Sequence, residues 1–358
     1  MREAVERGHI SGNGYFTRRC HEFFRKRFGF SQCLLTTSCT DALEMAALLI
    51  NLQPGDEVIM PSYTFVSTAN AFVLRGARIV FADSLPGHPN MDPEGLKKLV
   101  TPRTKAIVVV HYAGVACDMD PIMALAQRHN LYVIEDAAQA IDSYYKSRPL
   151  GSIGHMAAFS FHETKNIISG EGGMLVVNEP AFEKRAEILW EKGTNRAAFF
   201  RGETDKYSWV DMGSSFLPSD LIAAFLLAQL EQMDQIQQRR LEIWKRYHSG
   251  LKPLEEKKLL QLPAIPTFAS NNAHLFYLLL PDAESRQQLI NHLKQQGIMA
   301  VFHYLSLHRS AFYLMKHDGR QLPHCDRFSD GLLRLPLFFE LKDEQVDHII
   351  RQIHQALS

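Results

Sequence analysis

The sequence has no long apolar run and no excess of either charge. Its 358 residues are 46% hydrophobic, but apolar runs such as 106–110 and 131–134 are far shorter than the roughly 20 residues needed to cross a bilayer. Lysine plus arginine and aspartate plus glutamate number 39 each, so no net field favours nucleic acid or an anionic membrane. We therefore expect neither as a partner, and any anionic ligand must be bound locally.

The cysteine and histidine patterns of disulfide scaffolds and metal sites are also absent. The five cysteines are odd in number, widely spaced and form no CxxC pair. The sixteen histidines form no HExxH or similar spacing, so we expect no metal. Residues 1–14 are polar and glycine-rich, unlike the basic and then apolar start of a secretory signal. These absences favour a cytoplasmic protein.

Short β-rich runs alternate with helical stretches from about residue 33 to 180. This alternation predicts an α/β fold with a mostly parallel central sheet. The expected strands are 56–60, 78–82, 105–110, 132–135, 156–161 and 173–178, and the expected helices are 41–52, 68–75 and 120–129.

The pattern changes after a long helical stretch from Ser219 to about Gly250. Beyond Pro253, strand candidates at 274–280 and 299–302 are mixed with amphipathic helices at 284–296 and 342–357. We predict a large domain over 1–240 and a smaller C-terminal α+β domain over 241–358. Because no Gly/Ser/Pro linker separates them, the two should pack closely.

Two segments place polar groups at positions where α/β sheets bind ligands. Residues 36–41, TTSCTD, precede a strongly helical run, so hydroxyls and free amides converge at a helix start that is either an anion site or an ordinary cap. The apolar strand 131–134 ends in Glu135 and Asp136. Asp136 either caps the next helix or keeps a heteroaromatic ring nitrogen protonated.

Lys165 lies between a strand and a glycine-rich turn, within SFHETKNIISGEGG at 160–173. A lysine partly withdrawn from water loses its proton more easily and becomes an amine nucleophile, although most lysines are simply solvated. In the segment 61–70, Tyr63 or Phe65 stacks on a flat cofactor or packs in the core.

In this order and at these intervals, the four segments resemble the DegT/DnrJ family of pyridoxal 5′-phosphate (PLP) sugar aminotransferases. The motifs EDAAQ at 135–139 and SFHETKNIISGEGG carry the resemblance, and the segments 55–76, 111–117, 191–196 and 200–202 are similar to the dTDP-4-amino-4,6-dideoxygalactose transaminases. The resemblance implies the aspartate-aminotransferase fold (PLP fold type I), with PLP as cofactor.

Matched position by position, the resemblance assigns roles around PLP. Lys165 would carry the cofactor as a Schiff base, Asp136 would face the pyridine nitrogen, and Phe65 would stack on the ring. Gln139 would touch the ring face or the phenolic oxygen. The matched phosphate-binding positions are Thr40, Asp41, Ser160 and Ser215, of which Ser215 replaces an Asn that relatives send to the neighbouring subunit's phosphate.

The resemblance also implies the reaction and the assembly. L-Glutamate would aminate dTDP-4-keto-6-deoxy-D-glucose to the 4-amino-4,6-dideoxy-D-galactose product, for a surface glycan such as enterobacterial common antigen. The protein would be a homodimer with active sites at its interface. Four side chains are candidates for binding the donor carboxylate or the nucleotide diphosphate: Arg196, Arg201, His303 and His308. Arg201 is favoured because arginine pairs bidentately with such groups.

Several alternatives stay open at this point. Amination could occur at sugar C3, or give the gluco epimer, and a PLP-binding regulator would need no sugar site. Relatives in which histidine replaces the lysine are sugar dehydratases, and Lys165 argues against that activity. Family members usually begin earlier, with an extended Pro-containing segment and a first helix, so either the gene start is misassigned or the chain is naturally short. Loss of that segment would be expected to weaken dimer packing or substrate closure.

Overall fold

A computed structural model describes residues 1–357 and confirms the predicted α/β class. The central feature is a seven-stranded sheet. In spatial order its strands are β1 (Gln32–Thr36), β11 (Gly173–Val177), β10 (Met156–Ser160), β7 (Tyr132–Asp136), β6 (Thr104–Val110), β2 (Glu57–Pro61) and β3 (Arg78–Ala82). The six strands predicted within it lie within one residue of their expected ends, whereas β1 was predicted only as the start of the pattern.

All strands of this sheet run in one direction except β11, which is antiparallel to both β1 and β10. The carboxyl ends of β1, β10 and β7 therefore meet at one edge. Thr36, Ser160 and Asp136 are the last residues of those three strands. This edge brings together segments far apart in the sequence, as is usual for ligand sites in α/β sheets.

Helices cover both faces of the sheet, because its buried strands alternate between two apolar cores. Ile107 and Val109 of β6 pack into one core, and Ala106 and Val108 pack into the other. The α-helices of this part are α1 (Arg2–Glu6), α2 (Tyr15–Phe28), α3 (Cys39–Leu49), α4 (Val66–Val73), α5 (Met119–His129), α6 (Glu183–Trp190), α7 (Arg196–Phe200) and α8 (Asp220–Glu231). Smaller elements are β4 (Ser84–Leu85), β5 (His88–Met91), β8 (Tyr144–Tyr145), β9 (Arg148–Pro149), η1 (Gly95–Lys98), η2 (Tyr112–Gly114) and η3 (Pro180–Phe182).

A third core lies in the C-terminal part, around a three-stranded antiparallel sheet in the order β12, β14, β13. Its elements are α9 (Met233–Glu256), β12 (Phe276–Leu279), α10 (Ala283–Gln295), β13 (Val301–Phe302), η4 (Leu307–Arg309), α11 (Pro323–Gly331), β14 (Leu332–Leu335) and α12 (Asp343–Leu357). The single helix expected over 219–250 is two helices that meet at Gln232, whose backbone leaves helical geometry (φ −106°, ψ 9°).

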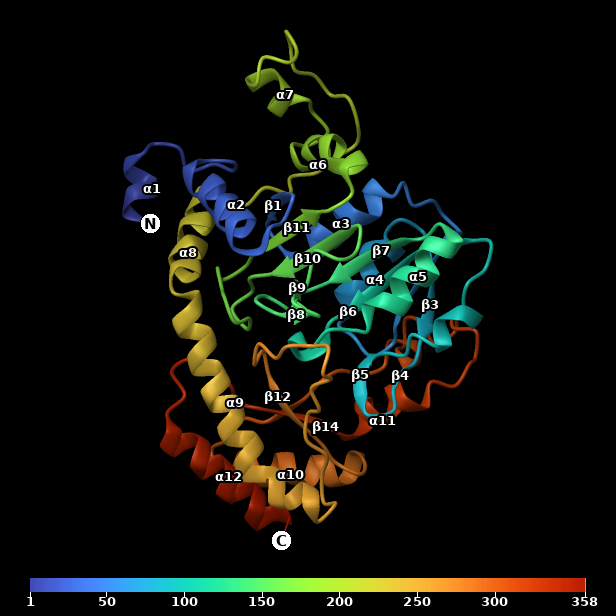
Figure 1. Cartoon of the computed structure of the whole chain (residues 1–358), viewed down its shortest axis with the longest axis vertical. Helices are drawn as coiled ribbons and strands as arrows, with labels where there is room; N and C mark the ends of the chain where they lie inside the picture. The colour runs from blue at the N-terminus through green and yellow to red at the C-terminus, as the bar shows by residue number, and fades with distance from the viewer. Residues whose placement is uncertain (358) are drawn as a thin grey trace.

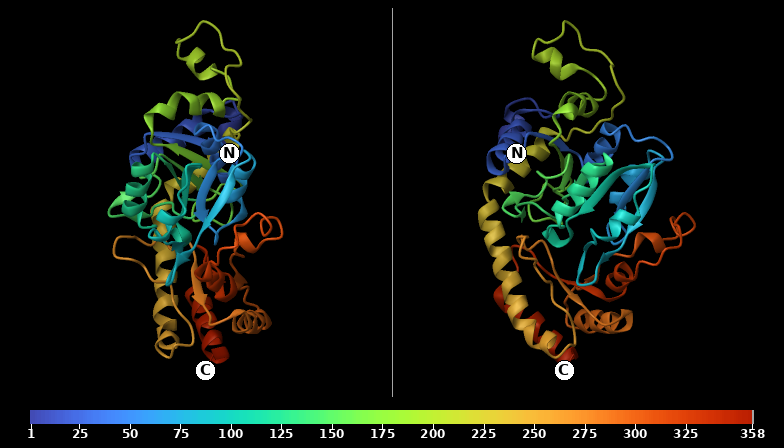
Figure 2. Two further views of the ribbon diagram at one scale, coloured as in Figure 1. Left: turned by 90° about the vertical axis from the view of Figure 1, so that its right-hand side faces the viewer. Right: turned by 45° about the vertical axis from the view of Figure 1, so that its right-hand side comes forward.

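Helix α9 spans the change from one core to another. Met233 and Ile236 pack in a core of the large sheet, whereas Ile243 and Tyr247 pack in the C-terminal core. Figure 1 shows α8 and α9 following one side of the molecule, with the C-terminal elements below the large sheet. In all the ribbon views the segment around α7 projects from the opposite end (Figure 2). Within residues 1–357, no helix combines the length and the apolar character that crossing a membrane requires.

Candidate active site

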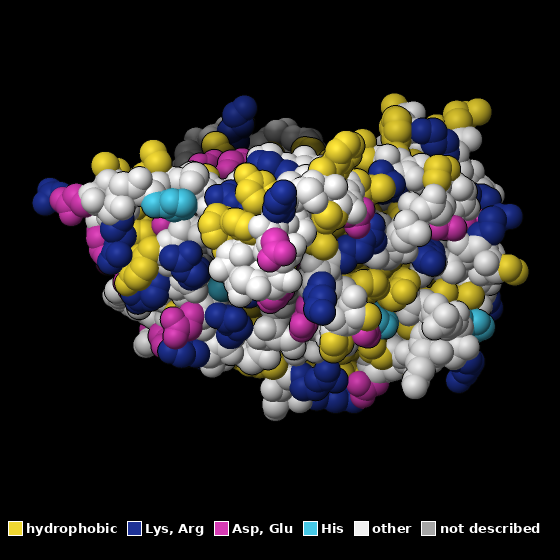
Figure 3. Space-filling model, turned by 90° about the horizontal axis from the view of Figure 1, so that it is seen from above, with side chains coloured by type: hydrophobic (Ala, Val, Ile, Leu, Met, Phe, Trp, Pro, Cys, Tyr) yellow, Lys and Arg dark blue, Asp and Glu magenta, His cyan; other side chains and the backbone are white. Residues whose placement is uncertain are grey.

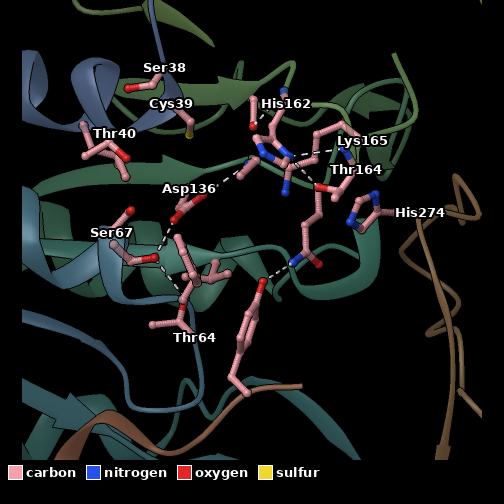
Figure 4. Close-up of a pocket in the computed structure, with 18 of the residues that line it drawn as sticks. Ser38, Cys39, Thr40, Thr64, Ser67, Asp136, His162, Thr164, Lys165 and His274 are labelled. Atoms are coloured by element: carbon pink, nitrogen blue, oxygen red, sulfur yellow. Dashed lines mark hydrogen bonds between the residues drawn. The ribbon is translucent and has the colours of Figure 1, made fainter. Parts of the chain in front are cut away.

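A cavity of about 540 Å³ lies at the carboxyl edge of the large sheet. This volume falls within the roughly 300–1,000 Å³ typical of sites for small organic ligands. The large sheet and its helices form one wall, and the C-terminal part forms the other through His274, His303, Tyr304 and Arg334. In Figure 4, Ser38, Cys39 and Thr40 lie on one side of the cavity, Lys165 and His274 lie on the other, and Asp136 lies between them.

The start of α3 is built as an anion site. Ser38 caps the helix, and its Oγ accepts a hydrogen bond from the Asp41 amide at 3.1 Å. The amides of the first helical turn have no partner within the helix, so those of Cys39 and Thr40 are left to a ligand. Gly173 of β11 runs so close beneath this turn that a Cβ there would overlap the Ser38 and Cys39 backbone.

Of the expected phosphate-binding positions, three lie at this end of the molecule. Thr40 and Ser160 line the cavity, Ser160 from the end of β10. Asp41 does not line it, because its amide is bonded to Ser38 and its carboxylate accepts the Thr37 hydroxyl. Thr40 and Ser160 are therefore better placed for an anion than Asp41.

Asp136 is buried at the end of β7 and is held in one orientation. Its Oδ2 accepts the Thr68 hydroxyl at 2.7 Å, and its Oδ1 accepts the Ala138 amide at 3.2 Å. Because Thr68 donates to Asp136, its oxygen accepts the Thr64 hydroxyl, 2.9 Å away. Burial raises the pKa of Asp136, while these hydrogen bonds and the Lys165 charge act to lower it.

The side chains expected to contact a cofactor ring lie together around Tyr304. Gln139 accepts the Ala113 amide at 2.6 Å, which turns its amide nitrogen towards the Tyr304 hydroxyl at 3.2 Å. Phe65 caps the start of α4, is 54% exposed and has its ring centroid 5.9 Å from that of Tyr304. An exposed aromatic face beside a cavity is available for stacking.

Lys165 lies on a tight loop between β10 and β11. The loop is closed by hydrogen bonds from the Phe161 amide to the Gly172 carbonyl and from the Glu163 amide to the Gly170 carbonyl, both 2.8 Å. Burial lowers the pKa of the Lys165 amine, and the carboxylate of Asp136 acts in the opposite direction. A lowered pKa means that more of the amine is neutral at a given pH, as a nucleophile or base requires.

The chemical groups that line the cavity match the parts of a PLP molecule. The α3 amides and the Ser38, Thr40 and Ser160 hydroxyls suit a phosphate, and Asp136 suits a protonated ring nitrogen. Phe65 suits a flat ring, and Lys165 suits an aldehyde carbon. When bound, PLP acts as an electron sink for the pair left behind when a bond at the donor's α carbon breaks.

Only part of the expected substrate-binding set lies at the cavity. His303 lines it, whereas His308 is buried against Ser62, with Nδ1 2.7 Å from the Ser62 hydroxyl. Arg201 is exposed and forms ion pairs with Glu187 at 2.9 Å and Glu203 at 2.7 Å. Arg196 and Ser215 are also outside this chain's own cavity.

Several lining residues were not predicted from the sequence: Thr64, Thr68, His274, Tyr304 and Arg334. The hydroxyl-rich segment at 61–70 could have pointed to Thr68, since it follows a strand that ends at the site. His274, Tyr304 and Arg334 reach the cavity through the packing of the C-terminal sheet, which no local pattern reveals.

The carboxylate before Asp136 supports the site from behind. Glu135 is fully buried and accepts the amides of Gly151, Ile153 and Gly154 at 2.6–2.8 Å, and its Oε2 lies 3.0 Å from His111 Nε2. Burial acts to raise the pKa of Glu135, but the bonds from His111 and the amides outweigh it, and the pKa ends below its ordinary value.

We expect Glu135→Gln to lower the free energy of unfolding by about 3 kcal/mol, because an amide cannot accept all these donors. Since its pKa is lowered on folding, Glu135 stabilises the protein above its ordinary pKa of 4.5, and this contribution is lost as pH falls through the folded value. Denaturant unfolding at neutral and acidic pH measures both effects. The exposed Glu94→Gln is the control, and equal stability of the two variants would contradict this role.

Comparison with known proteins also indicates a PLP-dependent aminotransferase. The model of the DegT/DnrJ/EryC1/StrS aminotransferase family matches residues 1–354. The spore coat polysaccharide biosynthesis protein SpsC of Bacillus subtilis (strain 168) is 35% identical over 364 aligned positions, which cover 99% of this chain and 92% of SpsC.

Solved structures agree with the family match. The aminotransferase TlmJ from Streptoalloteichus hindustanus superposes with a TM-score of 0.91 at 30% identity, covering 99% of this chain and 94% of TlmJ. The PLP form of Spr1654, a proposed sugar aminotransferase from Streptococcus pneumoniae, superposes with a TM-score of 0.89 at 26% identity, covering 99% and 95%. Spr1654 is also known in its PMP form.

Proposed function

Because this chain belongs to the DegT/DnrJ/EryC1/StrS aminotransferase family, whose members depend on PLP, we propose that it aminates a specific nucleotide sugar. The donor is L-glutamate and the acceptor is dTDP-4-keto-6-deoxy-D-glucose. The products are 2-oxoglutarate and dTDP-4-amino-4,6-dideoxy-D-galactose, a precursor for surface glycans. The observation that carries amino transfer is Lys165, a half-buried lysine whose amine has a lowered pKa and shares one cavity with the oriented carboxylate of Asp136.

Three relationships support a sugar nucleotide as the acceptor. SpsC is named for polysaccharide biosynthesis, and Spr1654 for sugar amination. The segments 55–76 and 111–117 resemble the transaminases that form the 4-amino-4,6-dideoxygalactose nucleotide. A PLP-binding regulator would need neither a nucleophilic lysine nor a second wall of polar side chains.

Within this reaction Lys165 moves protons. Its neutral amine accepts the proton from the donor's α carbon and later delivers a proton to the sugar carbon that receives the nitrogen. Asp136 keeps a proton on the ring nitrogen by placing a negative charge beside it. Ser38, Thr40 and Ser160 hold the phosphate, and the walls of the cavity limit access of water to the reacting carbon.

The product decides between the alternatives. We expect incubation with L-glutamate and dTDP-4-keto-6-deoxy-D-glucose to release 2-oxoglutarate and to give a nucleotide sugar with nitrogen at C4. Proton NMR couplings at C4 distinguish the galacto from the gluco epimer. Nitrogen at C3 would contradict the proposed position of amination, and the gluco product would contradict the proposed configuration at C4. If no 2-oxoglutarate were released, glutamate would be excluded as the donor.

We propose further that the protein is a homodimer in which the α7 extension, residues 191–215, reaches the partner subunit's site. Large apolar side chains are exposed along it, with Trp209 82% exposed and Phe200 69% exposed. Figure 3, which looks down on the end bearing this extension, shows hydrophobic side chains interspersed with lysine and arginine. Exposed apolar groups of this kind favour a protein interface. Arg196, Arg201 and Ser215 would then serve the partner's cavity.

We expect a particle of twice the 40.8 kDa chain mass in sedimentation velocity. Trp209→Glu should shift it towards the monomer, because a charge would be buried at the interface. The control is Met315→Glu, a change at a side chain that is 91% exposed elsewhere on the surface. A wild-type monomer, or a dimer unaffected by the Trp209 change, would exclude this assembly.

A further inference from the structure

Arg334 is a cation on the cavity wall without a carboxylate partner in residues 1–357. It belongs to β14 of the C-terminal sheet and lines the cavity, and its side chain is half-buried. Its hydrogen bond within the described chain runs from Nη1 to His303 Nε2, at 3.2 Å. A guanidinium carries five N–H donors, so most of its donors are left for a ligand.

His303 fixes Arg334 without neutralising it. Because a guanidinium can only donate, His303 Nε2 must accept, which leaves the imidazole proton on Nδ1 to be donated to the Tyr112 hydroxyl at 2.9 Å. Burial, together with the charges of Arg334 and Lys165, lowers the pKa of His303 to about 2. The imidazole is therefore neutral, and the positive charge of Arg334 stays uncompensated.

The carboxylates of the cavity are already engaged elsewhere. Asp136 accepts Thr68 and the Ala138 amide, and Glu171, whose side chain is 70% exposed to solvent, lies 3.5 Å from His162 and forms no ion pair with Arg334 within residues 1–357. A half-buried guanidinium without a counter-ion is less well solvated than one in bulk water, so the position suits an anionic ligand. The planar fork of arginine matches a carboxylate or a phosphate.

Arg334 does not lie at the end of the cavity that suits the cofactor phosphate, so the anion that it would bind is a different one. The phosphate end is the start of α3, where Ser38 and Thr40 lie across the cavity from Lys165 and His274 (Figure 4). The positive charge of Arg334 instead acts to lower the pKa of Lys165, and it acts in the same direction on the pKa values of His274 and Tyr304. Because Arg334 and Lys165 line the same cavity, an anion bound to Arg334 lies within the space that also holds the Lys165 amine.

We propose that Arg334 binds the carboxylate of the amino donor and thereby presents the donor's amino group beside Lys165. This rests on the proposed amino transfer and gives the donor a site that Arg201, paired with Glu187 and Glu203, does not provide in the single chain. 2-Oxoglutarate, which keeps the same carboxylates, occupies the same position when it leaves.

The test uses ligands that bind without reacting. Calorimetric titration of the PLP-loaded protein with glutarate reports the carboxylate site, and titration with dTDP reports the nucleotide diphosphate site. Loss of charged hydrogen bonds in Arg334→Gln should weaken glutarate binding roughly 10- to 100-fold and leave dTDP binding within about 2-fold. Arg334→Lys, which keeps the charge but loses the fork, should give an intermediate value.

Arg327→Gln is the matched control, because this exposed arginine of α11 bonds only to Pro86 and Gln261 within residues 1–357. PLP content and thermal unfolding of each variant establish that the site is intact, and Arg334→Lys serves if the Gln variant does not fold. Unchanged glutarate binding, weakened dTDP binding instead, or no glutarate binding by the wild type would overturn the proposal. Failure of the proposed function is seen separately, as wild-type cofactor absorbance that glutamate does not change.

Discussion

Replacing Lys165 by alanine is expected to abolish amino transfer from L-glutamate, by at least roughly 10⁴-fold. The change removes both the amine that attaches the cofactor and the base that moves the proton. It should leave the fold intact, because the loop at 161–172 is closed by backbone hydrogen bonds rather than by this side chain. Release of 2-oxoglutarate and the absorbance change on adding glutamate measure the loss.

A second measurement separates attachment from proton transfer. Borohydride treatment of the wild type should fix the cofactor to Lys165, seen as a mass increase on the peptide that contains it. The Ala variant should show no such increase, whereas the exposed Lys245→Ala should behave as the wild type. A Lys165→Ala protein that still released 2-oxoglutarate at an appreciable rate would rule out this lysine as the catalytic base.

Asp136→Asn is expected to lower the rate of amino transfer by about 10²- to 10⁴-fold while leaving the shape of the site almost unchanged. The carboxamide is the same size as the carboxylate but carries no charge to hold a proton on the ring nitrogen. Loss of that proton weakens the cofactor as an electron sink. Single-turnover absorbance after mixing with glutamate measures the rate directly.

Thr68→Val provides a graded comparison. It removes the 2.7 Å hydrogen bond that orients Asp136 but keeps the charge, so we expect a loss of about 10-fold. If Asp136 mattered only for packing, the Asn variant would be as active as the wild type. An equal loss in the two variants would show that orientation, rather than charge, is the main contribution.

The large sheet was predictable because its strands carry local signals. Runs such as 106–110 are apolar, rich in β-branched residues and of strand length, and the alternation with helices fixes the class. Gln232 shows the limit of this approach. Nothing in its neighbourhood is a helix breaker, and the division between α8 and α9 arises where the chain passes from one apolar core to another.

The two walls of the candidate site also differ in how far their residues could be predicted from the sequence. Asp136 ends one strand and Lys165 follows another, so their place at the carboxyl edge could be inferred from chain direction alone. Arg334 and Tyr304 come from short strands and loops whose position depends on how the C-terminal sheet docks. His308 illustrates the converse, since it was a candidate for binding the donor or the nucleotide, whereas it is bonded to Ser62 inside the protein.

The division of the cavity between two cores has a consequence for protein engineering. The groups suited to PLP come from the large sheet, whereas the groups facing the opposite side come from β14 and the segments that contain His274 and His303. Exchanging the C-terminal wall between relatives would thus change which substrates fit while keeping Lys165 and Asp136, provided that the bonds of Tyr304 to Gln139 and of His274 to Asn166 are kept. Because α9 continues from one core into the other, a chimaera joined within that helix would keep the spacing of the two walls.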